Sequence, residues 1–153
     1  MSPRAAWRLE AVGFAPVYDY VAGKSDWLAA DLPFEGSARL AGQFTRRNVA
    51  TASEDTPAAD ALRRLDARGF GPAIVLNQAG VVMGAVHRDQ LASAAEGISA
   101  GTLMRFGVTT VRPSEQAADV VHRMGHAQVT RIVVTRSDGT LVGLFFAEDF
   151  GSG

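Results

Sequence analysis

The sequence contains no cysteine among its 153 residues, which excludes disulfides, thiolate metal sites and a cysteine nucleophile. An excess of one charge is also missing, because 15 Lys and Arg stand against 16 Asp and Glu. Such a balance gives no broad field that would attract nucleic acid or anionic lipid, so we expect neither as a partner. No apolar run approaches the roughly 18 residues of a membrane span, and the first residues lack the apolar core of a signal peptide. We therefore expect a cytoplasmic protein that does not bind membranes.

An internal duplication organises most of the chain. Aligning Val49 with Val108 gives an offset of 59 residues, and the register then holds without a gap. With 47% hydrophobic residues, the chain can bury a core shared by two such units. The superposed pairs include Thr51 on Thr110, Arg64 on Arg123, Gly84 on Gly143 and Leu91 on Phe150.

Each copy has the same succession of patterns. A short β-prone stretch precedes an amphipathic helix, then come two strands joined by a turn that ends in glycine, and a short last helix. The two apolar runs after the long helices are rich in β-branched residues and too short for helices. We therefore predict an α/β (α+β) fold of two β-α-β-β-α repeats packed as a pseudo-two-fold pair. The predicted long helices contain residues 58–65 and 117–124, and the strands after them residues 73–76 and 132–134.

Four motifs of the second copy carry a resemblance to a known family. They are Thr102-Leu103-Met104, the stretch 108–114, the strand 131–134 and the hairpin 137–143. In order, spacing and repetition they resemble a tandem pair of CBS domains, the arrangement called a Bateman module. The resemblance covers about two-thirds of the chain. It implies a first CBS repeat over residues 44–98 and a second over residues 99–150, preceded by a linker over residues 37–43.

The leader, residues 1–36, resembles a different family. A helix over 4–14, a strand over 17–21 and a helix over 23–30 give an α-β-α order similar to the C-terminal tail of a rhodanese-like domain. The leader lacks the catalytic cysteine of that family, so sulfur transfer through a persulfide is not available. It is too short for its own core but rich in aromatic residues, so we expect it to pack on the CBS pair or on another chain. Whether Met1 is the native start stays open.

The resemblance implies an adenosine-containing ligand in the cleft between the repeats. In the family pattern a return-strand glycine is followed by a Ser or Thr three residues on and by an Asp three further, which binds the ribose hydroxyls. The second copy keeps Asp149 but has Phe146 at the hydroxyl position, and the first has His87 there and Gln90 at the Asp position. For Asp149 the alternative interpretation is a residue that opens the last helix. The candidate ligand-binding residues are Asp149, Thr110, Arg131, Phe146, Thr51 and His87.

Two further groups of residues invite functional interpretations. His122 and His126 are spaced i, i+4 on a predicted helix, but no carboxylate joins them at metal spacing, so we expect no metal site. The pairs at 46–47 and 63–64 are all arginine and give local positive charge near the first copy. That charge would meet phosphates or the acidic face of a partner.

These observations favour a non-catalytic regulatory module over an enzyme, because no nucleophile with an obvious base and no paired carboxylates stand out. The expected ligand is AMP, ADP, ATP or S-adenosylmethionine, and no cofactor is required. The alternative is a ligand-free dimeric scaffold or protein-interaction module that uses the aromatic leader. The family resemblance implies self-association, so a homodimer fits both hypotheses.

Overall fold

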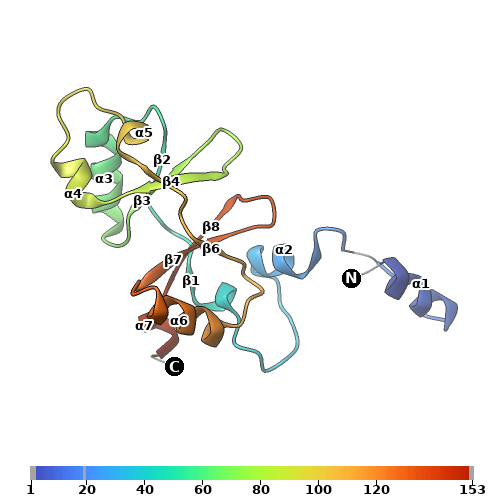
Figure 1. The fold of residues 1–153 in the computed structure, drawn as a ribbon. Coiled ribbons are helices and arrows are strands. Elements are labelled where there is room, and N and C mark those ends of the chain that lie inside the picture. The colour runs from blue at the N-terminus through green and yellow to red at the C-terminus, as the bar shows by residue number, and fades with distance from the viewer. Residues whose placement is uncertain (1–2, 19, 152–153) are drawn as a thin grey trace.

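The structure is a computed structural model and describes residues 3–18 and 20–151. Two helices of the leader precede two compact repeats that lie side by side (Figure 1). The leader and first repeat contain α1 (Pro3–Ala11), α2 (Gly23–Ala29), the 3-10 helix η1 (Ala41–Phe44), β1 (Thr45–Arg46), β2 (Thr51–Ser53), α3 (Ala58–Arg68), β3 (Ala73–Leu76), β4 (Val82–Val86) and α4 (Arg88–Ala92). The rest contains α5 (Ala100–Leu103), β5 (Arg105–Phe106), β6 (Thr110–Val111), α6 (Ala117–His126), β7 (Arg131–Thr135), β8 (Leu141–Phe146) and α7 (Ala147–Gly151).

The strands form two four-stranded sheets, with orders β2-β3-β4-β5 and β1-β8-β7-β6. In each repeat a parallel pair, β2 with β3 or β6 with β7, is joined through the long helix, since parallel neighbours need a crossover. An antiparallel hairpin, β3-β4 or β7-β8, completes the unit. The predicted α/β fold of two β-α-β-β-α repeats is therefore confirmed.

The two repeats exchange their first short strands. β1 precedes the first repeat but pairs with β8 of the second, and β5 precedes the second repeat but pairs with β4 of the first. Both contacts need a glycine in the receiving strand. A Cβ on Gly143 would clash with the backbone oxygen of Arg46, and one on Gly84 would lie 2.6 Å from the backbone oxygen of Arg105. The duplicated glycines therefore serve the close approach of the exchanged strands.

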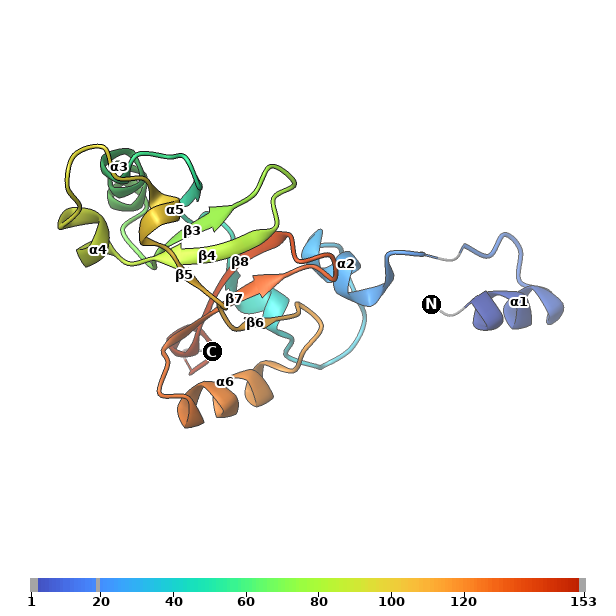
Figure 2. The ribbon, with the colours of Figure 1, turned by 45° about the horizontal axis from the view of Figure 1, so that its top comes forward.

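Three apolar clusters hold the molecule together. One lies between the first sheet and its helices, with Leu65 and Val75 buried in it, and a second lies between the other sheet and its helices, with Val120 and Phe145. The third joins the two sheets across the pseudo-two-fold axis. Figure 2 shows these sheets in the middle, with α3 and α4 on one side and α6 on the other. The third cluster contains Val49, Ile74, Ala85, Val133, Leu144 and Phe146.

The two long helices contain the stretches predicted for them, 58–65 and 117–124. Ala58, Ala61 and Leu65 are the buried stripe of α3, and Ala117, Val120 and Met124 that of α6. Gly69 ends α3 in the left-handed conformation with φ of 75°, which glycine adopts without steric cost.

The leader differs from the prediction in its middle. Residues 17, 18, 20 and 21 form no strand, and Asp19 lies outside the described residues. The prediction of a strand here was wrong because a strand needs a neighbour for its backbone hydrogen bonds, and this stretch has none in the two sheets.

The two leader helices behave differently. Both views place α1 apart from the repeats, and its Trp7 is 69% exposed (Figures 1 and 2). Helix α2 packs on the second repeat, where Leu28 and Ala29 are buried and Ala29 joins the apolar cluster of that repeat. None of the helices in the described ranges is long and apolar enough to cross a membrane.

Candidate functional site

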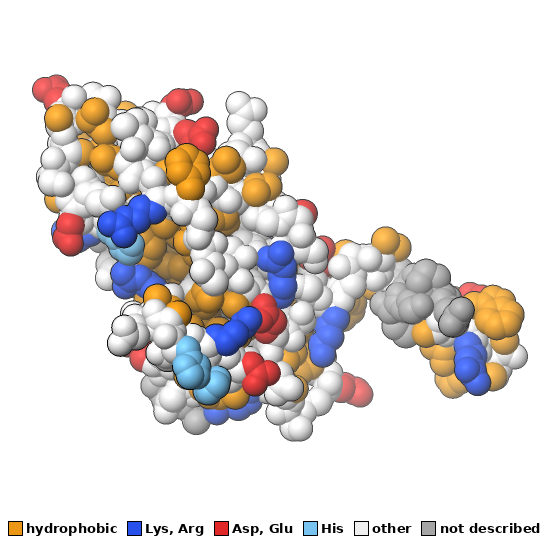
Figure 3. Space-filling model, in the orientation of Figure 1, with side chains coloured by type: hydrophobic (Ala, Val, Ile, Leu, Met, Phe, Trp, Pro, Cys, Tyr) orange, Lys and Arg blue, Asp and Glu red, His pale blue; other side chains and the backbone are white. Residues whose placement is uncertain are grey.

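A cavity of about 520 Å³ opens between the two repeats. The first repeat contributes Pro72, Ala85 and His87, and the second repeat with the segment before it contributes the rest. Figure 3 shows a hollow between the repeats with hydrophobic side chains inside and His and Lys or Arg side chains at its edge. The other lining residues are Val108, Thr109, Val111, Arg123, Met124, Ala127–Arg131, Ile132, Val133 and Leu144. We call this cavity the open half-cleft.

The chemistry of the open half-cleft is apolar and basic. Aliphatic side chains form its walls, the polar groups include the hydroxyls of Thr109 and Thr130, and its cations are Arg123 and Arg131. None of the described residues that line it is Asp or Glu. Arg123 pairs with Glu115, whereas Arg131 makes no ion pair within the described chain. One basic side chain is therefore available for an anion.

The lowered pKa of His87 reflects the burial and the positive charges at this site. Its imidazole is half-buried where β4 passes into α4, and burial lowers its pKa below the usual 6.5. The charges of Arg131 and Arg105 lower the pKa of His87 further, while Asp89 opposes them. The ring is therefore neutral at pH 7, when it can both donate and accept a hydrogen bond. Two arginines acting on one imidazole indicate a positive potential at this end of the cavity.

The duplication creates an equivalent position on the other side of the axis, which we call the closed half-cleft. With the offset of 59 residues, Phe146 stands where the first repeat has His87, and Phe70 stands where the second has Val129. The two phenyl rings meet edge to face with centroids 5.8 Å apart, and Phe146 is 7% exposed. Aromatic side chains thus fill the space that stays open in the other half.

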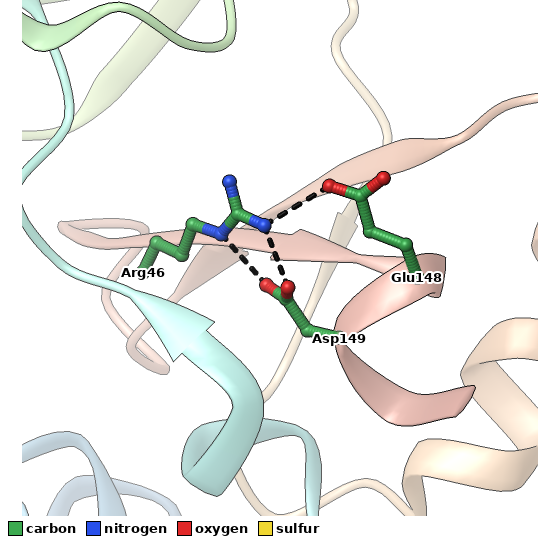
Figure 4. A network of polar contacts seen from close by, with 3 residues as sticks. All are labelled: Arg46, Glu148 and Asp149. Atoms are coloured by element: carbon green, nitrogen blue, oxygen red, sulfur yellow. Dashed lines mark hydrogen bonds and ion pairs between the residues drawn. The ribbon is translucent and has the colours of Figure 1, made fainter. Parts of the chain in front are cut away.

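Arg46 completes the closed half-cleft. From β1 its guanidinium donates two parallel hydrogen bonds to Asp149 at the start of α7, with Nε–Oδ2 of 2.7 Å and Nη2–Oδ1 of 2.6 Å (Figure 4). The same Nη2 lies 3.0 Å from Oε1 of Glu148, and the guanidinium carbon lies 4.2 Å from the centre of the Phe146 ring. The hydrogen bonds and charge of Asp149 raise the pKa of Arg46. We call the Arg46–Asp149 pair the clasp.

The structure separates the candidate residues into two groups. His87 and Arg131 line the open half-cleft. Phe146 and Asp149 belong to the closed half-cleft, where Asp149 lies in the first turn of α7, as its alternative interpretation requires, and binds Arg46. Thr51 and Thr110 begin the equivalent strands β2 and β6, and neither lines the cavity, although the neighbouring Thr109 does. Their roles toward a ligand stay predictions.

All four arginines of the two pairs at 46–47 and 63–64 make hydrogen bonds within the chain. Arg46 is bound in the clasp, and Arg47 donates hydrogen bonds to the backbone oxygens of Leu28 and Ala29. Arg63 pairs with Asp60. Arg46 and Arg47 are thus engaged within the chain, and the interpretation of the arginine pairs as a site for phosphates or an acidic partner stays a prediction.

His122 and His126 lie on the exposed face of α6 with their Nε2 atoms 3.3 Å apart. Over residues 3–18 and 20–151, no group of three potential metal ligands comes together.

Sequence reasoning missed the segment 127–130 and Arg123, which form much of the cavity wall. The internal duplication could have indicated this wall, because the pseudo-two-fold axis that relates the repeats places the end of α6 opposite the end of β4. Arg123 also aligns with Arg64, so the repeat itself singled the position out.

One of the comparisons with known proteins identifies the family of the chain. The profile of the CBS domain matches residues 41–97 and 100–150. No curated protein sequence matches the chain. The family match begins after the leader, so the resemblance of residues 1–36 to a rhodanese-like tail stays a prediction.

Several solved structures share the fold. The CBS domains of a transcriptional regulator from Streptococcus pneumoniae superpose with a TM-score of 0.67 at 21% identity, over 74% of this chain and 98% of that one. CBSX2 of Arabidopsis thaliana, solved in complex with AMP, gives 0.64 at 22%, over 72% and 92%. The cytosolic domain of the Mg²⁺ channel MgtE in complex with ATP gives 0.68 at 20%, over 73% of this chain and 47% of that one. The chain thus spans about half of the channel domain's length.

At such identities the structural likenesses concern the fold alone. The family assignment depends instead on the profile, which matches two consecutive segments that together make up well over half of the chain. The boundaries of these segments coincide with the two repeats seen in the fold, including the exchanged first strand of each. The chain therefore belongs to the CBS domain family and contains two CBS domains in tandem.

Proposed function

We propose that this CBS pair is a non-catalytic regulatory module that binds an adenosine nucleotide in the open half-cleft. The observation that carries the proposal is the cavity of about 520 Å³ between the repeats, which has apolar walls, a basic edge and no carboxylate in its described lining. AMP is bound by CBSX2 and ATP by the MgtE cytosolic domain, both of which share the fold.

Each part of a nucleotide has a matching group in the cavity. The apolar walls near Val108 and Val133 suit the base, and the hydroxyls of Thr109 and Thr130 suit the sugar or phosphate oxygens. Arg131 suits the phosphate, because it has no ion-pair partner among the described residues and guanidinium binds phosphate through two parallel hydrogen bonds. His87, neutral at pH 7, suits a sugar hydroxyl.

The same chemistry separates the candidate ligands by charge. AMP, ADP and ATP are anions and gain from Arg131. S-adenosylmethionine carries a sulfonium and an ammonium group, which a site with arginines and no carboxylate disfavours. We therefore expect the module to prefer the nucleotides over S-adenosylmethionine.

A regulatory role suits this site better than catalysis. In the described lining only His87 titrates near neutral pH, and no carboxylate there orients it or shares its proton. Acid-base chemistry usually depends on such a pair. A ligand between the repeats would instead favour one packing of the pair over another, which is how a binding site controls a conformational equilibrium.

The experiment is thermal unfolding of the purified chain with AMP, ADP, ATP or S-adenosylmethionine in excess. A ligand that binds only the folded state at 100 times its Kd stabilises by about 2.7 kcal/mol, or roughly 5–10 °C for a chain of this size. We expect the three nucleotides to raise the midpoint and S-adenosylmethionine to leave it nearly unchanged. No shift with any nucleotide would refute the proposal.

A second candidate function is a dimeric protein-interaction module, favoured by the leader. Trp7, Phe14 and Tyr18 are 69%, 63% and 79% exposed, a concentration of aromatic surface typical of segments that bind a partner. A homodimer fits either function and predicts twice the chain mass in light scattering after size exclusion. The cytoplasmic location stays a prediction, tested by cell fractionation.

A further inference from the structure

Two neighbouring arginines, one at the end of β1 and one directly after it, reach in different directions. Arg46, the last residue of β1, extends into the closed half-cleft and forms the clasp with Asp149. Arg47, the next residue, reaches the leader helix α2 instead. Successive side chains of extended backbone point to opposite sides, so one short segment contacts both places. Any movement of β1 therefore affects both contacts together.

Arg47 is the polar anchor of α2. Its guanidinium donates to the backbone oxygens of Leu28 and Ala29 in the last turn of the helix and lies 3.6 Å from a carboxylate oxygen of Asp31. A cation at the C-terminal end of a helix interacts favourably with the helix dipole and adds hydrogen bonds to its last carbonyl groups.

The docking of α2 is otherwise weak. The helix has seven residues, too few to be stable without tertiary contacts, and buries only Leu28 and Ala29. It also carries a cost, because Ser25 Oγ and Asp26 Oδ1 are buried without a hydrogen-bond partner in the described structure. Each such group opposes docking, because it loses its hydrogen bonds to water and gains none in return. The position of α2 therefore depends on the few favourable contacts it has, among them Arg47.

β1 is also weakly held by its backbone. It has two residues at the edge of its sheet and pairs only with β8, at Thr45 with Phe145 and Arg46 with Leu144. The clasp adds the two short hydrogen bonds to Asp149 and the stacking of the Arg46 guanidinium on Phe146. The side chains of Arg46 and Asp149 are only 35% and 28% exposed, so solvent screens the pair incompletely. The clasp is thus a principal constraint on the end of β1.

We infer that the clasp is a latch that holds the leader helix α2 on the second repeat by fixing the strand end from which Arg47 reaches it. Opening the clasp withdraws Arg47 from the end of α2, and the helix then detaches with its buried Ser25 and Asp26 returned to water. The latch links a position between the repeats to the leader and does not require a bound nucleotide. Its test is therefore independent of the proposed function.

The experiment is hydrogen–deuterium exchange of the full chain without nucleotide, read at residues 24–31 and, as an internal reference, in α6. We compare the wild type with Arg46→Ala and Asp149→Asn, which open the clasp, and with Arg47→Ala, which removes the anchor directly. Arg63→Ala is the matched control, since it breaks an exposed arginine–aspartate pair far along the chain from α2.

We expect exchange in α2 to accelerate about tenfold in Arg46→Ala, Asp149→Asn and Arg47→Ala, with α6 unchanged, and Arg63→Ala to match the wild type. The fluorescence of Trp27, made the sole tryptophan by Trp7→Phe, would change in the same three variants.

Wild-type exchange in α2 of both clasp variants, alongside faster exchange in Arg47→Ala, would overturn the inference. Equal acceleration of α2 and α6 would overturn it as well, because the clasp would then support the whole second repeat rather than the leader. If Arg46→Ala does not fold, Arg46→Lys takes its place, because it keeps the charge and loses the paired hydrogen bonds. The two outcomes above would then overturn the inference in the same way.

Discussion

Replacing Arg131 with alanine tests the proposed nucleotide site most directly. The side chain lies at the start of β7 on the edge of the open half-cleft, half-buried and without an ion-pair partner in the described chain. A hydrogen bond to a charged group contributes about 1.5–3 kcal/mol, and partial exposure puts Arg131 at the lower end. A loss of about 1.5–2 kcal/mol corresponds to a Kd for AMP roughly 10–30 times weaker.

Isothermal titration of AMP into wild type and Arg131→Ala measures this loss. The control is Arg136→Ala, which removes an arginine of similar exposure just beyond the other end of the same strand and outside the cavity lining. A second readout is independent of the ligand: because Arg131 is one of the charges that lower the pKa of His87, the substitution should raise that pKa in an NMR titration.

Three results would refute this reasoning. Equal AMP affinity in Arg131→Ala and wild type would mean that the phosphate is bound elsewhere. An equal loss in Arg136→Ala would mean that the effect is the general removal of positive charge rather than a contact in the cavity. An unchanged pKa of His87 would show that Arg131 does not face the imidazole as described.

Three further predictions follow from the fold. The pKa of His87 lies below 6.5 in the folded state, so the imidazole of the unfolded chain binds a proton more tightly than that of the folded chain. The free energy of unfolding should therefore fall as the pH drops below about 6.5. Thermal melts over this pH range should show a smaller fall for His87→Gln than for the wild type. Gly143→Ala would force a Cβ against the backbone oxygen of Arg46, and we expect a loss of about 1–3 kcal/mol in urea unfolding. The control is Gly125→Ala on the exposed face of α6, where an added Cβ meets nothing within 4 Å and should cause no such loss. Phe145→Ala empties a fully buried site in the second repeat and should lower the free energy of unfolding by about 3–5 kcal/mol; a loss below 1 kcal/mol would contradict the described core.

The repeats were predictable because their pattern is local and occurs twice. Short-range interactions determine these patterns, which are the helical spacing in 58–65 and 117–124, the β-branched runs after each helix and the turns that end in glycine. The offset of 59 residues aligns the two copies, so each element predicted in one copy could be compared with its equivalent in the other. The strand predicted at 17–21 failed for the complementary reason. Local composition favours extended backbone there, but pairing is a tertiary property, and neither sheet includes a strand from this stretch.

The candidate site was harder because it depends on contacts across the pseudo-two-fold axis. Aligning the copies identified equivalent positions, such as His87 with Phe146, but not which half of the cleft would stay open. That difference arises from the size of two side chains, Phe70 and Phe146, and from Arg46, which lies 103 residues from its partner Asp149. The single Asp that kept the family pattern is therefore engaged within the chain.

The asymmetry of the two half-clefts has a physical consequence for how such a module responds. In a CBS pair with two equivalent open half-clefts, ligands would bring the two repeats together equally at both half-clefts. Here one end is already held by the clasp and the Phe70–Phe146 contact, so we expect a ligand at the other end to act on the two repeats asymmetrically. β1 and Arg47 lie on that closed side, and α2 is docked there through them. Because Arg46 of the clasp and Arg47, which contacts α2, are adjacent residues, we expect a change in the packing of the closed side to alter the docking of the leader helix.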